Sequence, residues 1–269
     1  MSLLQAVVLG AVQGLTEFIP ISSSGHLVLV PEALGWSEPG LAFDVFLHSA
    51  SLVALLAYFA GDLIDLVRGV VARDRDSMRL FGLLVVGTIP AVIAALAFED
   101  FFEDAFEEPS AAAVLLLVTA AVLVSAELIL RRHESRSARA GGSLRDINDL
   151  KYRDAGVVGV AQAFAILPGI SRSGATIGAG LGLKMARDDA ARFAFLLAIP
   201  ALIGASLVQI PELGSSEIGP GAALGGFAAS LVTSYAAIAG LIRYLKTRTL
   251  YPFAVYCIIA SGIFSLLVS

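Results

Sequence analysis

The sequence is short of charged residues, and those that it has are unevenly placed. Charged residues occupy 15% of its 269 positions, while 57% of the positions are hydrophobic. A soluble domain carries about 25% charged residues, so this composition excludes an ordinary soluble enzyme and indicates a polytopic membrane protein. The net charge is −5, and there is no basic arm or zinc-type Cys/His spacing. We therefore expect no nucleic-acid partner.

Cysteine is almost absent. Cys257, in the last apolar segment, is the only one. A single cysteine excludes an intrachain disulfide and a thiol metal cluster, and we expect it to act as a small apolar residue. The first residues, MSLLQAVVLGAVQGLTEF, lack a basic n-region and a cleavage signal. We therefore expect them to belong to the mature protein rather than to a signal peptide.

Long apolar runs are plentiful. Six of them can cross about 30 Å of hydrocarbon at 1.5 Å per residue. They cover approximately 43–60, 80–98, 110–130, 192–210, 221–242 and 251–268. Two further apolar regions, 2–30 and 154–183, are interrupted by IPISSSG and LPGISRSG. Their arms of about 12–15 residues are too short to cross singly, which predicts two re-entrant helix–loop–helix hairpins.

The basic residues predict the orientation of these segments. All but one of the 18 Lys and Arg residues fall in four stretches, 68–79, 131–153, 184–192 and 243–248. The loops between them contain acidic residues and no basic ones. By the positive-inside rule the four basic stretches are cytoplasmic and the acidic loops are external. Both termini are then expected outside, in a multi-pass protein of the plasma membrane.

The two interrupted regions resemble each other. Residues 10–25 align with 159–174 at a constant offset of 149, and Gly, Gln, Ile and Ser positions match. Each half contains one hairpin and three spans, and an odd number of spans reverses the second half. We expect one all-α membrane domain over 1–269, with six transmembrane helices and two re-entrant hairpins in an inverted-topology repeat. Repeat 1 covers about 1–130, a cytoplasmic linker about 131–153, and repeat 2 about 154–269.

Arg172 is the one basic residue outside the four stretches. No other charged residue lies between Asp154 and Lys184. A guanidinium in an apolar membrane segment costs about 2.5–3.5 kcal/mol, so it needs a partner or a function. Its rigid fork of donors suits phosphate oxygens. The sequence thus points to an anionic substrate bound within the bilayer.

Glu17 is the corresponding acidic residue of the first hairpin, and it lies on one helical face with Gln13. Such a carboxylate is expected to be a general base or a metal ligand; the alternative is a helix-end carboxylate satisfied by the Ser22–Ser24 backbone. His26, one turn into the returning helix, is a candidate nucleophile or acid/base group; alternatively, it forms an interhelical hydrogen bond. Polar residues elsewhere are expected to make packing contacts (His48, Asp44) or to reach the membrane surface (Glu127).

Hydroxyl groups gather at both breaks, and each set is followed by glycine: Ser22, Ser23, Ser24, and Ser171, Ser173. They can cap the returning helices. A Ser/Gly loop that begins a helix also presents backbone N–H groups to an anion. Two such loops, opposed across the repeat, would direct two helix N-termini and one guanidinium at the same anion.

The motifs QGLTEFIPISSSGH and LPGISRSGAT resemble the undecaprenyl-diphosphatase (bacitracin-resistance) family of integral membrane phosphatases, over essentially the whole chain. This resemblance implies hydrolysis of undecaprenyl diphosphate to the monophosphate, which recycles the lipid carrier for cell-wall polymers. It implies an inverted-repeat fold, a divalent cation and a site that opens to the external face. The expected partners are the lipid substrate and the bilayer, and a homodimer is left open.

The resemblance also assigns residues. Gln13 and Glu17 fill the carboxylate/amide motif, while Ser23 and His26 fill positions for the nucleophile or acid/base group. The phosphate-binding motif falls on Ser171, Arg172, Ser173 and Thr176. Because Gln13 is an amide, Glu17 is the only carboxylate, and it would hold a Mg²⁺ or Ca²⁺ together with the diphosphate and water.

Phosphate transfer is the expected chemistry. Arg172, the loop N–H groups and the serine hydroxyls would stabilise the phosphate charge, with Ser22 and Ser24 among the substrate-binding groups. Glu17 would activate the attacking group, which is Ser23, His26 or water. The alternative function is a transporter or flippase of a phosphorylated polyprenyl lipid, because broken helices in inverted repeats are also transporter architecture.

Overall fold

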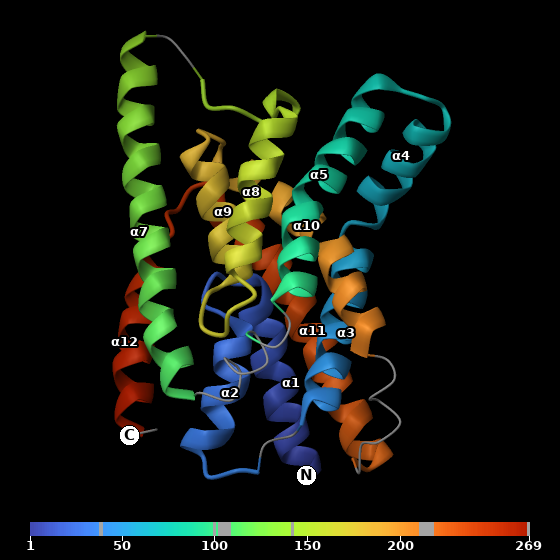
Figure 1. Cartoon of the computed structure of the whole chain (residues 1–269), viewed down its shortest axis with the longest axis vertical. Helices are drawn as coiled ribbons and strands as arrows, with labels where there is room; N and C mark the ends of the chain where they lie inside the picture. Colours follow the sequence, from blue (N-terminus) through green and yellow to red (C-terminus); the bar gives the residue numbers. More distant parts are fainter. Residues whose placement is uncertain (38–39, 99–100, 102–108, 141–142, 210–217, 268–269) are drawn as a thin grey trace.

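The computed structural model describes residues 1–37, 40–98, 101, 109–140, 143–209 and 218–267, and α-helices dominate that part of the chain. Figure 1 shows them as an elongated bundle. In chain order they are α1 (Leu3–Phe18), α2 (Ser23–Ala33), α3 (Leu41–Tyr58), α4 (Ala60–Val71), α5 (Arg75–Ala97), α7 (Pro109–Ala140), α8 (Tyr152–Phe164), α9 (Arg172–Gly182), α10 (Arg187–Gln209), α11 (Pro220–Leu245) and α12 (Tyr251–Leu267). A short 3₁₀ turn, η1, covers Ile147–Asp149. The all-α prediction is confirmed for these residues.

The six predicted spans fall on α3, α5, α7, α10, α11 and α12. Four of them, α5, α7, α10 and α11, are each long and apolar enough to cross a membrane. Helix α3 reaches that length only together with α4, which bends away from it by 70°, and α12 is apolar but has 17 residues. Length and composition therefore support a multi-pass membrane protein with four or five spans in the described part of the chain. Most of the predicted external loops 99–109 and 211–219 lies outside that part.

Two helix–loop–helix hairpins occupy the middle of the bundle, α1 with α2 and α8 with α9. In Figure 1 the first hairpin rises from the lower end of the molecule, the second descends from the upper end, and their loops meet near mid-height. Gly25 lies against Gly169, where an added Cβ would be 3.1 Å from the Gly169 Cα. The Ser173 hydroxyl also donates to the Ile19 carbonyl oxygen over 3.3 Å. The two interrupted regions of the sequence thus come into contact.

Each hairpin is interrupted where the sequence cannot continue a helix. Pro20 follows α1 by two positions, and the residue before a proline is driven out of the helical region. Ile19 is accordingly extended, with a ψ of 135°. In the second hairpin Gly169 has a φ of +90°, a conformation that glycine adopts without steric cost. Both breaks are therefore encoded locally.

The returning helices α2 and α9 start with the same cap. The Ser22 hydroxyl accepts from the backbone N–H of Gly25 over 3.4 Å, and the Ser171 hydroxyl accepts from that of Gly174 over 3.0 Å. These bonds satisfy N–H groups that have no partner within the helix. The capping role proposed for these two serines is therefore confirmed.

Close glycine contacts hold the first arm of each hairpin against a neighbouring helix. A Cβ added to Gly10 would lie 2.1 Å from the carbonyl oxygen of Gly226, so α1 and α11 touch backbone to backbone. In the same way, a Cβ on Gly159 would lie 2.4 Å from the carbonyl oxygen of Gly87, between α8 and α5. Small residues permit such close approach of membrane helices. Each hairpin is thus packed against a helix from the other half of the chain.

A buried ion cluster ties α7 to α10. Glu127 on α7 is fully buried, and its carboxylate accepts two hydrogen bonds from Arg187 over 3.0 and 2.8 Å. Its Oε1 also accepts from the backbone N–H of Leu250 over 2.8 Å, and Arg187 makes a further bond to Glu134 over 2.7 Å. The expectation that Glu127 reaches the membrane surface is therefore wrong, because the neighbouring helix supplies a buried guanidinium.

The segment before α8 is also held in place, beyond the end of α7 at Ala140. The Arg145 guanidinium bonds the Asp154 carboxylate over 2.6 Å and the Leu183 carbonyl oxygen over 3.1 Å. It therefore links the start of α8 to the end of α9. Arg145 thus holds together the two ends of the second hairpin that lie farthest from its loop, while the loop reaches into the bundle.

Breaking the Glu127 cluster should destabilise the protein. Glu127→Ala leaves Arg187 charged in a site where its side chain is only 14% exposed, so we expect a loss of about 3–5 kcal/mol in the free energy of unfolding. Thermal or denaturant unfolding of the purified protein in detergent measures this loss. The matched control is Glu134→Ala, because this partner of the same arginine is 37% exposed and should cost about 0–1 kcal/mol. Equal losses of unfolding free energy for the two variants would contradict the conclusion that Glu127 is the main buried partner of Arg187.

Candidate active site

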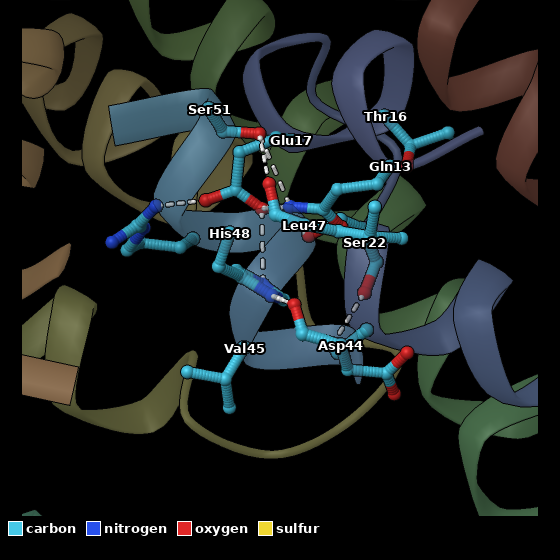
Figure 2. A network of polar contacts seen from close by, with 12 residues as sticks. Gln13, Thr16, Glu17, Ser22, Asp44, Val45, Leu47, His48 and Ser51 are labelled. Carbon is cyan, nitrogen blue, oxygen red and sulfur yellow. Dashed lines mark hydrogen bonds and ion pairs between the residues drawn. The ribbon is translucent and has the colours of Figure 1, made fainter. Parts of the chain in front are cut away.

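Glu17, near the end of α1, is the centre of a buried polar network (Figure 2). Its side chain is 4% exposed. The Oε2 atom accepts hydrogen bonds from the Ser23 hydroxyl and, over 3.1 Å, from Gln13 Nε2. The Oε1 atom accepts a hydrogen bond from Arg172 Nη2. One carboxylate therefore links both arms of the first hairpin to the second hairpin.

Arg172 is the first residue of α9 and forms an ion pair with Glu17. Its side chain is 20% exposed, so the guanidinium lies at the edge of the buried network. The predicted partner of Arg172 is a phosphate, and the structure places a carboxylate there. A guanidinium has five N–H donors, so it can hold Glu17 and still offer donors to an anion.

Gln13 is held by hydroxyl groups of α3 and α11. Its Nε2 atom lies 3.4 Å from Ser51 Oγ as well as 3.1 Å from Glu17 Oε2. Ser51 in turn lies 2.9 Å from Ser234 Oγ and 3.2 Å from Ser230 Oγ. These three serines are buried, and the sequence analysis did not single them out. They fix the position of the Gln13 amide beside the carboxylate.

His48 joins the network from α3. Its Nε2 atom lies 3.5 Å from Glu17 Oε2, and its Nδ1 atom lies 2.7 Å from the Asp44 carbonyl oxygen. A carbonyl oxygen only accepts, so Nδ1 carries the hydrogen. Figure 2 shows the ring directed from Asp44 towards the carboxylate. The sequence predicts only packing contacts for His48, because its distance from Glu17 along the chain gives no local signal.

His26 is directed away from this network. Its Nδ1 atom lies 2.6 Å from the Ser22 carbonyl oxygen and its Nε2 atom lies 2.7 Å from the Tyr256 hydroxyl. The ring also stacks on Tyr256, with centroids 5.6 Å apart. Both ring nitrogens thus have partners, Nδ1 within the first hairpin and Nε2 on α12. The structure brings Ser23 to Glu17, and it places the imidazole elsewhere.

Ser22 and Ser24 lie beside Ser23 at the start of α2. Their hydroxyl oxygens are 3.4 Å apart, and Ser22 also caps the helix. Ser22 is buried and Ser24 is half-buried. The contacts of both side chains are local, as expected from capping. The N-terminus of α2 nevertheless lies beside Glu17, because the Ser23 hydroxyl donates to that carboxylate.

The second motif is arranged around the N-terminus of α9. Ser171 and Ser173 are buried, with hydroxyl oxygens 3.1 Å apart. Thr176 donates to the Arg172 carbonyl oxygen of its own helix over 2.8 Å. Thr119 on α7 accepts from the Ser171 backbone N–H over 2.9 Å. Thr119 is not among the residues predicted from the sequence, because its one signal is a hydroxyl in the middle of an apolar span.

A small cavity adjoins the Glu17–Arg172 pair. Its lining combines polar groups of both hairpins with apolar groups, namely Glu17, Phe18, Arg172, Ser173, Thr176, Ala194, Phe195 and Ala198. Residues of both hairpins therefore border one space, whose lining is mainly apolar.

The donor atoms around Glu17 suit a hard cation. In the described part of the chain no three His, Cys, Asp or Glu side chains converge on one point. However, the buried Gln13 Oε1 atom has no hydrogen-bond partner there, and amide, carboxylate and hydroxyl oxygens are the ligands of Mg²⁺ and Ca²⁺. The residues therefore fit a cation that takes few protein ligands and completes its shell with substrate and water.

The arrangement has a clear chemical capacity. A hydroxyl that donates to a buried carboxylate is an activated nucleophile, because the carboxylate can take its proton. A guanidinium and two helix N-termini beside it can stabilise the charge on a phosphoryl group. The structure thus brings a carboxylate, a hydroxyl and a guanidinium together in one network.

Known proteins match this chain over nearly its full length. The profile of the family described as Bacitracin resistance protein BacA matches residues 6–263. A protein of Methanosphaera stadtmanae named Undecaprenyl-diphosphatase is 41% identical, over all of this chain and 99% of its own length. Proteins of that name from Synechococcus elongatus and Moorella thermoacetica are 41% and 39% identical. Each covers 98% of this chain, with 92% and 97% of their own lengths. Because the match includes both hairpins and the network between them, this chain belongs to the bacitracin resistance protein BacA family.

Proposed function

We propose that this protein hydrolyses undecaprenyl diphosphate to undecaprenyl phosphate and inorganic phosphate. The observation that carries the proposal is the contact of the Glu17 carboxylate with both the Ser23 hydroxyl and the Arg172 guanidinium. Full-length relatives about 40% identical carry the name undecaprenyl-diphosphatase. The product is the lipid carrier for cell-envelope polymers, so the reaction recycles that carrier at the plasma membrane.

Ser23 is the nucleophile in this proposal. Glu17 takes the hydroxyl proton while the Ser23 oxygen attacks the terminal phosphorus, and the bond from that phosphorus to the bridging oxygen breaks. Undecaprenyl phosphate leaves, and a phosphoserine remains. Water then attacks the phosphoserine, which releases inorganic phosphate and restores the serine. The contact between Ser23 and Glu17 supports this choice over His26, whose ring nitrogens bond Ser22 and Tyr256.

Arg172 binds the terminal phosphate. Before the reaction the guanidinium balances the Glu17 carboxylate, and when Glu17 accepts the proton that attraction is lost. The guanidinium is then free to follow the charge that develops on the phosphoryl oxygens. The hydroxyls of Ser171 and Ser173, and the N-termini of α2 and α9, supply further donors to the same anion. Ser22, Ser24 and Thr176 line its approach.

A divalent cation completes the site in this proposal. Glu17 and Gln13 would hold it through oxygen atoms, with the diphosphate and water as the remaining ligands. When bound, it neutralises phosphate charge. The unpartnered Gln13 Oε1 atom supports this placement.

A flippase remains the second function to compare. Hairpins whose loops meet inside a bundle would also suit lipid translocation. The placement of a hydroxyl directly on the Glu17 carboxylate supports hydrolysis, because binding a phosphate requires only the guanidinium and N–H groups.

We also propose that the chain has six transmembrane helices and two re-entrant hairpins in an inverted repeat, with both termini and the site opening outside. Several matched contacts support this arrangement. Ser22 and Ser171 cap equivalent helices, and Gly10 and Gly159 make equivalent close contacts with α11 and α5. The charge bias of the loops independently supports the orientation.

Removing the nucleophile should abolish turnover. Ser23→Ala is expected to lower phosphate release from undecaprenyl diphosphate by about 10³-fold or more, while lipid binding is retained. The measurement is phosphate release by the purified protein in detergent. Ser49→Ala is a matched control, because the Ser49 hydroxyl donates to its own helix at Val45, and it should retain turnover.

Trapping distinguishes the chemical alternatives. A single turnover of the wild-type protein is quenched with acid, in which phosphoserine is stable. We expect the phosphoserine to be found at Ser23. If Ser23→Ala keeps its turnover, the attack belongs to water or to His26. If the wild-type protein binds the lipid but releases no phosphate, the flippase is the better assignment.

Removing divalent cations should slow the enzyme. Treatment with a chelator is expected to lower turnover by at least tenfold, and added Mg²⁺ or Ca²⁺ should restore it, because the cation neutralises phosphate charge. Gln13→Glu should lower the cation concentration needed for half-maximal turnover, since a second carboxylate strengthens a hard-cation site. Turnover that is insensitive to chelation would contradict the cation.

Sided labelling tests the topology. In a Cys257→Ser background, Ser37→Cys should react with a membrane-impermeant maleimide in intact cells, because residues 31–42 are expected outside. Asp76→Cys should react only after permeabilisation. The reverse pattern would overturn the orientation, and labelling of both sites in intact cells would overturn the number of crossings between them.

A further inference from the structure

Tyr256 is a polar contact between α12 and the first hairpin that the mechanism above does not use. Its hydroxyl lies 2.7 Å from His26 Nε2, and its ring stacks on the imidazole with an interplanar angle of 15°. His26 is 3% exposed, whereas Tyr256 is 42% exposed. The tyrosine therefore covers the histidine on the outer side of the bundle.

The hydrogen-bond partners define the roles of the two ring nitrogens. His26 Nδ1 lies 2.6 Å from the Ser22 carbonyl oxygen, which only accepts, so Nδ1 carries the hydrogen. In the neutral ring Nε2 is then an acceptor, and the Tyr256 hydroxyl donates to it. The hydroxyl thus stabilises the one tautomer that can hold the Ser22 carbonyl group.

Ser22 needs such support because its backbone is strained. Its φ is +71° and its ψ is 100°, and a residue other than glycine in this region is strained and persists only where its surroundings hold it. The Ser22 carbonyl oxygen accepts from His26 twice, from Nδ1 and from the backbone N–H over 3.3 Å. The next residue is Ser23, whose hydroxyl meets the Glu17 carboxylate.

The second hairpin provides an internal comparison. Ser171 caps α9 as Ser22 caps α2, but its φ is −69° and its ψ is 119°, an ordinary extended conformation. At the position of His26 the second hairpin has Ala175, whose backbone N–H alone reaches the Ser171 carbonyl oxygen, over 2.8 Å. The strained serine and the imidazole therefore occur together, in the hairpin that carries the nucleophile.

We infer that Tyr256 is a positioning residue for Ser23. It donates to His26, His26 holds the Ser22 carbonyl group, and the left-handed conformation of Ser22 directs the Ser23 hydroxyl at Glu17. This inference rests on the proposed function, because it assigns the alignment of that reaction's nucleophile. It also gives His26 a positioning role rather than a direct part in proton transfer.

Tyr256→Phe removes the hydroxyl and keeps the ring that stacks on His26. We expect kcat to fall by about ten- to hundredfold, the range known for partners that orient a metal-bound histidine, with an unchanged KM and an unchanged melting temperature. Tyr235→Phe is the matched control. Tyr235 is a similarly exposed tyrosine on α11 that contacts the Tyr58 ring, and its loss should leave kcat unaltered.

A double-mutant cycle tests whether Tyr256 acts through His26. His26→Asn has an amide N–H donor in place of Nδ1, but it has no acceptor at the position of Nε2, to which Tyr256 donates. In this background Tyr256→Phe should have no further effect on kcat. Independent, multiplicative losses would overturn the inference, and so would a fall in kcat that only follows a loss of folded protein.

The wild-type protein in the same assay separates the two proposals. If it hydrolyses undecaprenyl diphosphate and Tyr256→Phe matches it, the positioning role is overturned and the proposed function stands. If it releases no phosphate, both fail together.

Discussion

The ion pair between Glu17 and Arg172 is the interaction on which the rest of the structure depends. A carboxylate or a guanidinium alone in apolar surroundings is costly, and each of these groups lies near the break of its hairpin, far along the chain from the other charges at the outer ends. Because the two halves of the chain supply one partner each, both breaks must reach the same depth in the bundle. Proline, glycine and the serine caps produce breaks of that kind, and the glycine contacts with α5 and α11 set their depth.

Much of this could be predicted from sequence, because the signals are local. Breaks and charges in apolar segments identify the hairpins, Glu17 and Arg172 without any knowledge of packing. The roles of His48 and Tyr256 could not be predicted, since they depend on how α3 and α12 lie against the first hairpin. The direction of the His26 side chain could not be predicted either. It lies one turn of helix after Ser23 and follows the same loop, so the sequence does not show that the two side chains point to different partners.

The two hairpins share a scaffold and differ in chemistry. Both have a capped helix after a break, and both pack against a helix of the opposite half. The first supplies the carboxylate, the hydroxyl and a strained backbone, and the second supplies the guanidinium in a relaxed loop. Glu127 illustrates the same limit of local signals, since its burial becomes intelligible only through Arg187 on a distant helix. The two hairpins thus have the same architecture but contribute different groups to the site.

The backbone contact of α1 with α11 also constrains how the protein can be made. The ribosome delivers α1 first and α11 only after residue 220, and Arg172 follows Glu17 by 155 residues. During insertion the first hairpin must therefore lie beside lipid or the translocation machinery before α11 is present. In the folded protein α11 is the helix that this hairpin packs against most extensively. The network around Glu17 is consequently completed only once α11 has been made, because Ser230 and Ser234 of that helix belong to it.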